Sequence, residues 1–436
     1  MKSILLKLGK LMGVRVLAIV LTFVQTIVMT RVFGSEVFGL LSFGLSISAL
    51  LILVLSFGLD QVLMRDIARF GKAVAPKTER WTHVWHLIRR WVIPVTLTVA
   101  VTGVLVSELT DLAGVYRVSL IGTFLMLPVI LFRKYVEAIS LGTKQVVRSI
   151  IGSQIAYPIL MIIGGLSVMA LGLGSSAMTV TATYVCAGFG SLIVAILLIY
   201  PTFSSLRADG FGARDIVGES PGHRAILTSG GHFALVAFGF ILGQHISVLM
   251  TGVLAGPEDV ALVRIAARVA EMAGLMRTIV LLQYKPLLAE AYGKGDTALL
   301  QKHAYFMSKV LTITGVPATL GLWIFADRVM GVFGPEFVDG AWAMRLYVSG
   351  VFFLLICGPG STFLSFCGQE HLASRNLLVS VAIQFVLNLF LIPLFGPEGC
   401  AAASCVAMTY LAFSGRRLAI QKVGVDPSIF VIFKKV

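Results

Sequence analysis

The segment from Gly256 to Glu290 reads GPEDVALVRIAARVAEMAGLMRTIVLLQYKPLLAE and looks like one long membrane helix, yet it carries Arg264, Arg268, Glu271 and Arg277. The first three of these are spaced i, i+4, i+7 and therefore share one face of a helix. Each charge at bilayer depth costs at least about 2.5–3.5 kcal/mol, so a lipid-facing helix would not keep three of them in one stripe. We predict that this stripe faces a polar interior, which the rest of the chain must build.

The composition of the chain indicates a membrane protein with many spans. Of its 436 residues, 57% are hydrophobic and only 13% are charged, whereas soluble domains carry about 25% charged residues. Apolar runs of about 20 residues, each long enough to cross a bilayer, recur from end to end. No segment is both polar and long enough to form a soluble domain, so we predict an all-α integral membrane protein.

The chain is strongly basic, with a formal net charge of +14 and a pI of about 9.8. Two explanations stay open: positive charge kept in many short cytoplasmic loops, and attraction to an anionic ligand or lipid. Nucleic acid is not an expected partner, because the chain has no soluble basic domain. The five cysteines lie in or beside apolar segments without CxxC or histidine-paired spacing. They are expected to be small buried hydrophobic residues, and neither a metal nor a cofactor is expected.

Membrane-length apolar segments predict about twelve transmembrane helices. Lys and Arg gather in every second loop and in the C-terminal tail, whereas the loops between them are short and acidic or neutral. This alternation predicts that both termini are cytoplasmic. The first segment is too long for the apolar core of a signal peptide and is expected to stay as an anchor. The predicted segments are 11–32, 37–58, 88–108, 116–138, 150–171, 177–200, 226–253, 257–284, 306–327, 341–365, 373–395 and 397–415.

The two halves of the chain resemble each other. The helix-end sequence MTRVFGSE at 29–36 is similar to MTGVLAGPE at 250–258, and Pro94 and Pro317 both lie early in the third segment of their half. We predict two lobes of about six helices with the same orientation in the membrane. The predicted lobes are 1–200 and 225–415, with a cytoplasmic linker at 201–224 and a cytoplasmic tail at 416–436.

The repeat also suggests which residues line a central cavity. It places Ser42 and Ser46 of the first half where Arg264 and Arg268 stand in the second, so one wall would be cationic and the other small and hydroxylated. An ion pair between Arg268 and Glu271 at i, i+3 is the structural alternative, but it would leave Arg264 unpaired and the stripe net positive. The predicted cavity residues are Arg264, Arg268, Glu271, Ser42 and Ser46, together with Gln25 and Arg15 of the first segment.

Two further groups of polar residues are candidates for coupling and gating. His232 and His245 lie on the seventh segment and are candidates for ion coupling, although a lone histidine in a helix is more often a satisfied interior group. Charged side chains at the cytoplasmic ends of the second and fourth segments could form a gate, a headgroup entry site or a surface salt-bridge network. These residues are Asp60, Arg65, Arg133, Lys134 and Glu137.

Four motifs carry a resemblance to a known family. They are TRVFGSEVFGLLSF at 30–43, SFGLDQVLMRDIAR at 56–69, VFGPEF at 332–337 and RNLLVSVAIQFVLNLFLIPLFGPEGCAAAS at 375–404. In sequence, order and spacing the chain resembles the Wzx-type polysaccharide-biosynthesis flippases of the MOP superfamily over nearly its whole length. That resemblance implies a MATE-like, two-lobed bundle that alternates access.

The resemblance also implies a substrate and a location. The substrate would be a polyprenyl-diphosphate-linked oligosaccharide, such as an O-antigen, capsule or exopolysaccharide repeat unit, flipped across the bacterial cytoplasmic membrane. Membrane lipids, a glycan polymerase and glycosyltransferases would be partners, and we expect a functional monomer.

Other functions stay open beside this one. A MATE-type cation-coupled exporter would need an acidic interior, and a membrane glycan polymerase or ligase would need a large outer loop. The sequence lacks HExxH, GxSxG and P-loop motifs, so no enzyme is expected.

Overall fold

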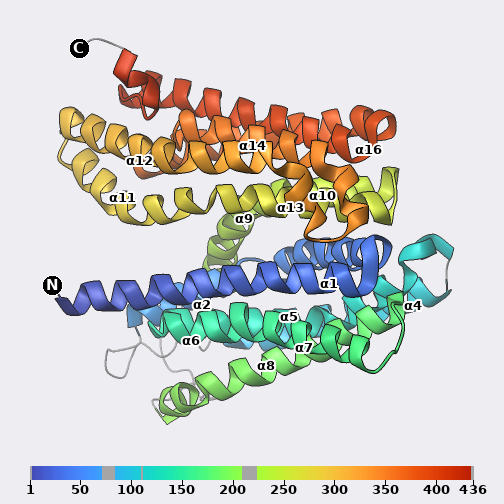
Figure 1. Cartoon of the computed structure of the whole chain (residues 1–436). Coiled ribbons are helices and arrows are strands. Elements are labelled where there is room, and N and C mark those ends of the chain that lie inside the picture. Colours follow the sequence, from blue (N-terminus) through green and yellow to red (C-terminus); the bar gives the residue numbers. More distant parts are fainter. Residues whose placement is uncertain (1, 71–83, 110, 209–222, 434–436) are drawn as a thin grey trace. The chain divides into compact units, whose positions relative to one another are not determined.

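The computed structural model of the chain describes residues 2–70, 84–109, 111–208 and 223–433, and every regular element within these residues is helical (Figure 1). The chain divides into two compact units, Met1–Phe238 and Gly239–Val436. The division falls inside helix α9, and each unit is described by itself. Most of the predicted linker, residues 209–222, lies outside the described residues.

Unit 1 contains the first half of the helices. They are α1 (Lys2–Ser56), α2 (Leu59–Phe70), η1 (Ile88–Val92), α4 (Ile93–Leu109), η2 (Asp111–Tyr116), α5 (Arg117–Gly142), α6 (Val146–Ile150), η3 (Ile151–Ile155), α7 (Ala156–Ala170), α8 (Ala177–Ala208) and the first part of α9 (His223–Leu254). The α5 helix packs against α1, α2, α4 and α8 and is therefore the central helix of this unit.

Unit 2 contains the end of α9 and the remaining elements. They are α10 (Pro257–Ala273), α11 (Leu275–Gly293), α12 (Thr297–Ile324), α13 (Ala326–Gly331), η4 (Pro335–Gly340), α14 (Ala341–Ile356), α15 (Gly360–Phe366), α16 (Glu370–Val423) and η5 (Ile429–Phe433). The α14 helix packs against α10, α12 and α16 and is the central helix of this unit.

Nine helices in the described part of the chain are long and apolar enough to cross a membrane. The predicted segments are largely helical, but 341–365 is broken at residues 357–359 between α14 and α15, where Gly358 has φ 73°, and 306–327 is broken at Phe325 between α12 and α13. The lower count has a structural cause. Both α1 and α16 contain two predicted segments each, and the segment 257–284 is divided into α10 and α11. The number of membrane crossings therefore depends on how the long helices are interrupted.

The first long helix, α1, is interrupted at Gly34. Fifty-five residues would extend for about 80 Å at 1.5 Å per residue, whereas a hydrocarbon core is about 30 Å thick. Gly34 has φ 77° and ψ 177°, a conformation that is essentially restricted to glycine. Figure 1 shows the blue ribbon of α1 turning back on itself, so that each arm is long enough to form one membrane span.

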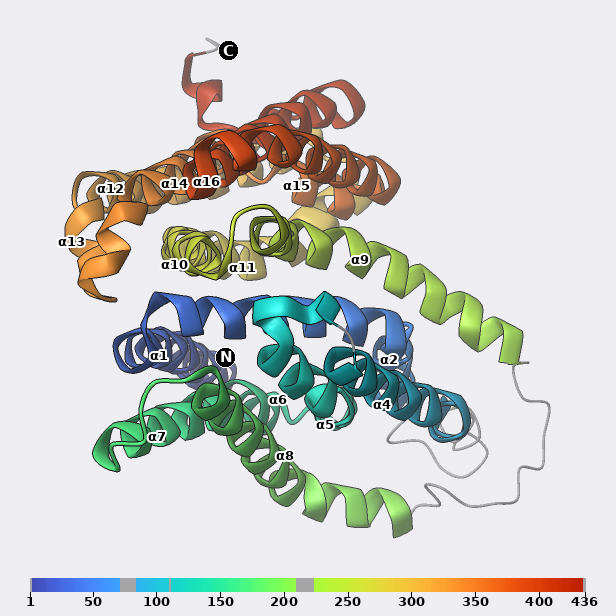
Figure 2. The ribbon, with the colours of Figure 1, turned by 90° about the vertical axis from the view of Figure 1, so that its right-hand side faces the viewer.

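The last long helix, α16, is a hairpin of two antiparallel arms. It turns at Gly396, with φ 54° and ψ −129°. The Gln384 Nε2 donates to Ser404 Oγ at 3.0 Å, and the Ser380 Oγ donates to the carbonyl of Ala407 at 2.7 Å. The residue number falls from 384 to 380 in one arm while it rises from 404 to 407 in the other, which is the pattern of antiparallel neighbours. Figure 2 shows the two red arms of α16 close together.

The prediction of one continuous helix over 257–284 was wrong. Gly274 ends α10, and its N–H bonds to the carbonyl of Glu271 at 3.0 Å. The next helix starts with an i to i−3 bond from Arg277 N–H to the Gly274 carbonyl at 3.0 Å. Because glycine has poor helix propensity, a break in the helix at this position costs little free energy.

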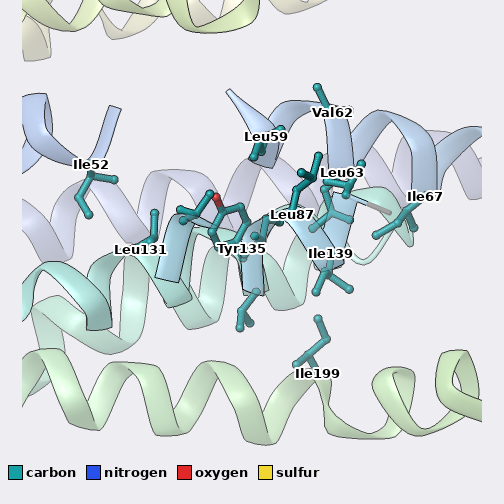
Figure 3. Packing of buried hydrophobic residues seen from close by; sticks show 14 of the residues in the cluster. Ile52, Leu59, Val62, Leu63, Ile67, Leu87, Leu131, Tyr135, Ile139 and Ile199 are labelled. Carbon is teal, nitrogen blue, oxygen red and sulfur yellow. The ribbon is translucent and has the colours of Figure 1, made fainter. Parts of the chain in front are cut away.

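The core of unit 1 joins α1, α2, α5 and α8. Ile52, Leu63, Tyr135, Ile139 and Ile199 are all buried in one hydrophobic cluster (Figure 3). Outside the bilayer, contacts of this kind stabilise the fold by about 25 cal/mol for each Å² of apolar surface removed from water. Within the bilayer, the stabilisation comes from close packing between helices. The cluster holds the part of α5 that carries the predicted gate residues.

The segment that follows α16 is bound to unit 2. We call Val425 to Phe430 the C-terminal strap. The Asp426 carboxylate accepts from Arg416 Nε at 3.0 Å and from Arg416 Nη2 at 2.7 Å, and its backbone exchanges two 2.9 Å hydrogen bonds with the Gln301 amide. Ser308 Oγ donates to the Pro427 carbonyl. The strap therefore joins α12 to the end of α16.

Acidification should release the strap. Burial raises the pKa of Asp426, but hydrogen bonds from Arg416 and Ser428 outweigh it and hold the pKa below its usual range. A depressed carboxyl pKa contributes stability above the unfolded value of about 3.9 and loses it as the pH falls through the folded value. We expect Asp426→Asn to lower the free energy of unfolding at pH 7 by about 1.5–3 kcal/mol and to weaken its acid dependence below about pH 4.

Thermal unfolding of the purified protein in detergent, followed across pH, measures both effects. Asp327→Asn is the matched control, because Asp327 pairs with Arg345 but is itself 56% exposed, and exposed pairs contribute little. Equal destabilisation by the two substitutions would contradict a special role for the strap.

Candidate functional site

The charged stripe lies on α10, and its position follows from the apolar residues of the same helix. Val260, Val263, Ala266, Val269 and Ala270 are buried and fix which face packs into unit 2. Arg264, Arg268 and Glu271 fall beside this face and stay partly accessible. The helix therefore keeps its charges together at the border of its packed surface.

Arg268 and Glu271 form the predicted ion pair. Arg268 Nη1 lies 3.3 Å from Glu271 Oε2, and the two side chains are 32% and 51% exposed. Arg264 is half-buried, and no hydrogen bond or ion pair joins it to any residue in the described part of the chain. Its charge is within electrostatic reach of Arg268, Glu271 and the buried Tyr347 of α14. The stripe thus carries one uncompensated positive charge.

Of the two candidate histidines, His245 has its side chain among the described residues. His245, on α9, is half-buried and lies within electrostatic reach of Arg264, so it belongs to the surroundings of the stripe. The side chain of His232 lies outside the described residues. Tyr347 was not anticipated, because no sequence spacing links residue 347 to residue 264.

The remaining predicted cavity residues belong to unit 1. Ser42 and Ser46 are 2% and 1% exposed, and the Ser46 hydroxyl donates to the Ser42 carbonyl at 2.9 Å. Gln25 is half-buried and Arg15 is exposed on α1. The two serines are therefore packed within the helical arm, whereas Arg15 presents its charge at the surface.

The predicted gate residues separate into small groups. Lys134 Nζ lies 3.4 Å from Asp60 Oδ1 and donates to the Ser56 hydroxyl at 3.0 Å. Arg65 Nε lies 3.1 Å from Asp66 Oδ1. This group is held where α2 and α5 meet the hydrophobic cluster of Figure 3.

Arg133 and Glu137 face other helices of unit 1. Arg133 Nη1 donates to Ser191 Oγ of α8 at 3.2 Å, and Glu137 Oε1 accepts from Ser153 Oγ of η3 at 3.3 Å. Residues 133 and 137 lie one turn apart on α5, and residue 134 lies to one side of them. The charged side chains of α5 therefore contact different neighbouring helices. Neither Ser153 nor Ser191 could be identified as a partner from the sequence.

Comparison with known proteins places these features in a family. The sequence profile of the family described as polysaccharide biosynthesis protein matches residues 5–284, which is more than half of the chain and includes the stripe on α10. The chain belongs to the polysaccharide biosynthesis protein family. The profile of the MatE family also matches, over residues 233–390. The family member is therefore a multi-pass membrane protein, as its apolar segments predicted.

A curated relative of this family member comes from the archaeon Haloferax volcanii. It is named "Probable low-salt glycan biosynthesis flippase Agl15" and is 30% identical over 93 residues, which cover 21% of this chain and 20% of the relative. The chain thus matches about a fifth of the length of that relative.

Solved structures share the fold of the family member. A multidrug resistance MATE family transporter in an inward-facing conformation has a TM-score of 0.70 at 15% identity, covering 93% of this chain and 94% of that one. The lipid II flippase MurJ in an inward closed conformation has a TM-score of 0.65 at 14% identity, covering 93% and 87%. A MOP superfamily transporter from Pyrococcus furiosus has a TM-score of 0.53 at 15% identity, covering 94% and 98%. At these identities the likeness establishes a MATE-like fold alone.

Proposed function

We propose that the protein is a flippase for a polyprenyl-diphosphate-linked oligosaccharide. The observation that carries the proposal is the stripe on α10, where Arg264 is half-buried without an ion-pair partner among the described residues. A charge in a membrane helix is costly unless it serves a pathway or a ligand. A diphosphate is a ligand that arginine recognises well, because the guanidinium fork matches two phosphate oxygens.

The proposed mechanism is alternating access through a cationic central cavity. In it, Arg264 and Arg268 bind the diphosphate, and Glu271 keeps Arg268 oriented through their 3.3 Å contact. Ser42, Ser46, Gln25 and Arg15 are the proposed cavity residues of the first lobe, and of these Gln25 and Arg15 are accessible in the structure. The pair of Lys134 and Asp60, with Arg65, acts at a cytoplasmic gate, and His245 and His232 are the candidates for ion coupling.

The proposed arrangement in the membrane follows the loop charges. Both termini are cytoplasmic, about twelve spans form two lobes of about six helices, and the membrane is the cytoplasmic membrane of a bacterium. Membrane lipids, a glycan polymerase and glycosyltransferases are the proposed partners of a functional monomer.

A cation-coupled small-molecule exporter is the second candidate, and the match of the MatE profile to residues 233–390 favours it. An exporter of organic cations would need negative charge in its interior. The stripe of two arginines and one glutamate is net positive, which supports an anionic substrate instead.

Transport by the purified full-length protein tests the proposal. In proteoliposomes containing a polyprenyl-diphosphate-linked oligosaccharide, we expect the protein to expose the glycan to an impermeant lectin on the opposite face. Empty liposomes and liposomes with an unrelated multi-pass protein are the controls. Absence of glycan movement, together with counterflow of an organic cation such as ethidium, would establish the exporter instead.

A further inference from the structure

Unit 1 contains a small cavity that the proposed transport path does not use. It has a volume of about 100 Å³ and is partly open. Its polar lining consists of Arg133 from α5, Tyr157 from α7 and Tyr184 from α8, and the rest is apolar, from Leu45, Met126 and Val129 among others. A water molecule takes about 30 Å³ in the liquid, so the cavity has room for one group of a few heavy atoms.

The cavity has hydrogen-bond donors but few acceptors. A guanidinium has five N–H donors, and in the described part of the chain Arg133 gives one hydrogen bond, to Ser191 Oγ. The hydroxyl oxygens of Tyr157 and Tyr184 are buried without a hydrogen-bond partner of standard geometry among the described residues. Ser48 interacts with Tyr184, but its own proton goes to the Gly44 carbonyl at 3.0 Å. Buried polar groups are nearly always paired, so these side chains are suited to a group that accepts hydrogen bonds.

The guanidinium is held in place over the cavity. Its Cζ lies 5.5 Å from the centre of the Tyr157 ring, and the Tyr157 and Tyr184 rings meet edge to face at 6.4 Å. Arg133 is nine residues before the end of α5 at Gly142, which is about 13 Å along the helix. At that depth an arginine without a compensating anion is costly.

The nearby carboxylates are engaged elsewhere. Glu137 lies one turn along α5 and within electrostatic reach of Arg133, but it accepts a hydrogen bond from Ser153, and no ion pair with Arg133 occurs in the described part of the chain. Asp60 pairs with Lys134 at 3.4 Å. Neither carboxylate lines the cavity.

We propose that this cavity binds one oxyanionic group, a phosphate or carboxylate, through Arg133, Tyr157 and Tyr184. The three side chains supply a charged fork and two neutral O–H donors, which is the donor set that oxyanions prefer. The anion comes either from a free solute or from the headgroup of a membrane lipid. The site is independent of the stripe on α10 and does not rest on the proposed transport function.

Inorganic phosphate is the probe for a free anion. The full-length protein in detergent is titrated with phosphate against chloride at equal ionic strength, and the melting temperature is followed. We expect phosphate to raise the melting temperature of the wild type, and Arg133→Gln to weaken the apparent affinity about 10–100-fold. Tyr157→Phe, which keeps the ring against Arg133, should weaken it about 2–10-fold.

A lipid probe separates the two sources of the anion. The protein is placed in nanodiscs of phosphatidylcholine and phosphatidylglycerol in equal amounts, extracted and examined by native mass spectrometry for retained phosphatidylglycerol. Arg148→Gln is the charge-matched control in both assays, because Arg148 is exposed and bonds to Gln145. A lipid headgroup is the ligand if the wild type retains phosphatidylglycerol, Arg133→Gln and Tyr157→Phe lose it, and phosphate does not change the melting temperature of the wild type.

The proposal is wrong if neither probe separates Arg133→Gln and Tyr157→Phe from Arg148→Gln. In that case water alone fills the cavity. Because Tyr157→Phe removes a single oxygen atom, it remains informative even where Arg133→Gln fails to fold.

Discussion

The double variant Arg264→Ala, Arg268→Ala should lose nearly all flippase output while it accumulates in the membrane close to the wild-type level. Each arginine is expected to give charge-assisted hydrogen bonds to the substrate diphosphate, and one such bond contributes about 1.5–3 kcal/mol. Losing both should reduce transport at least about 100-fold. The measurement is surface glycan in a flippase-null strain, with membrane protein quantified in parallel.

The single variants distinguish the contribution of the positive charge from that of the forked geometry of the guanidinium. Arg264→Ala is the cleaner test, because no described residue depends on Arg264 for an ion pair. Arg268→Ala also leaves Glu271 without its partner, so Arg268→Lys, which keeps the charge but loses the fork, should be impaired less. Arg375→Ala, at an exposed position of α16, is the matched control. Full glycan output from a normally expressed double variant would overturn the cationic-cavity mechanism but not the family membership.

Gly399→Ala should prevent unit 2 from reaching its native packing. Gly399 follows the turn of the α16 hairpin, and an added Cβ would overlap the carbonyl group of Leu391 in the opposite arm. Gly360→Ala should have a similar effect, since its Cβ would overlap the backbone of Gly415 where α15 meets α16. Overpacking of this kind costs about 1–3 kcal/mol and sometimes more, and backbone cannot move aside as a side chain can.

A third glycine provides the control for this prediction. Gly321 lies within α12, and an added Cβ there would have nothing within 4 Å, so Gly321→Ala should be neutral or slightly stabilising. Fluorescence-detected size exclusion and thermal unfolding in detergent measure the folded fraction and its stability. Equal behaviour of Gly399→Ala and Gly321→Ala would mean that the two arms of α16 are not as closely packed as the structure has them.

The helices could be predicted from the sequence because each apolar run has the length of a bilayer. The pairing of Arg268 with Glu271 could also be predicted, since the two residues are one turn apart on the same helix. The break at Gly274 was missed, because apolar residues continue on both sides of it and hide the end of α10.

Contacts between distant parts of the chain could not be predicted. The Ser191 partner of Arg133 is 58 residues away, and Tyr347, which lies within electrostatic reach of Arg264, belongs to another helix. Hydrophobic periodicity indicates which face of a helix is buried, but not which helix covers it. For the same reason Asp60, Arg65, Arg133, Lys134 and Glu137 seemed to be one cluster, although side-chain directions on α2 and α5 separate them.

The C-terminal strap has a consequence for how the protein is made. The Gln301 amide bonds to the backbone of Asp426, which is 125 residues further along the chain. At about 5–20 residues per second, synthesis needs roughly 6–25 s to cover that distance. During this interval α12 lacks the strap, so the Gln301 amide and the Ser308 hydroxyl need other partners, such as water, lipid headgroups or, for the hydroxyl, a carbonyl of α12 itself. Unit 2 therefore completes its packing only after residues 425–430 have been synthesised and reach Gln301 and Ser308 in the first half of α12.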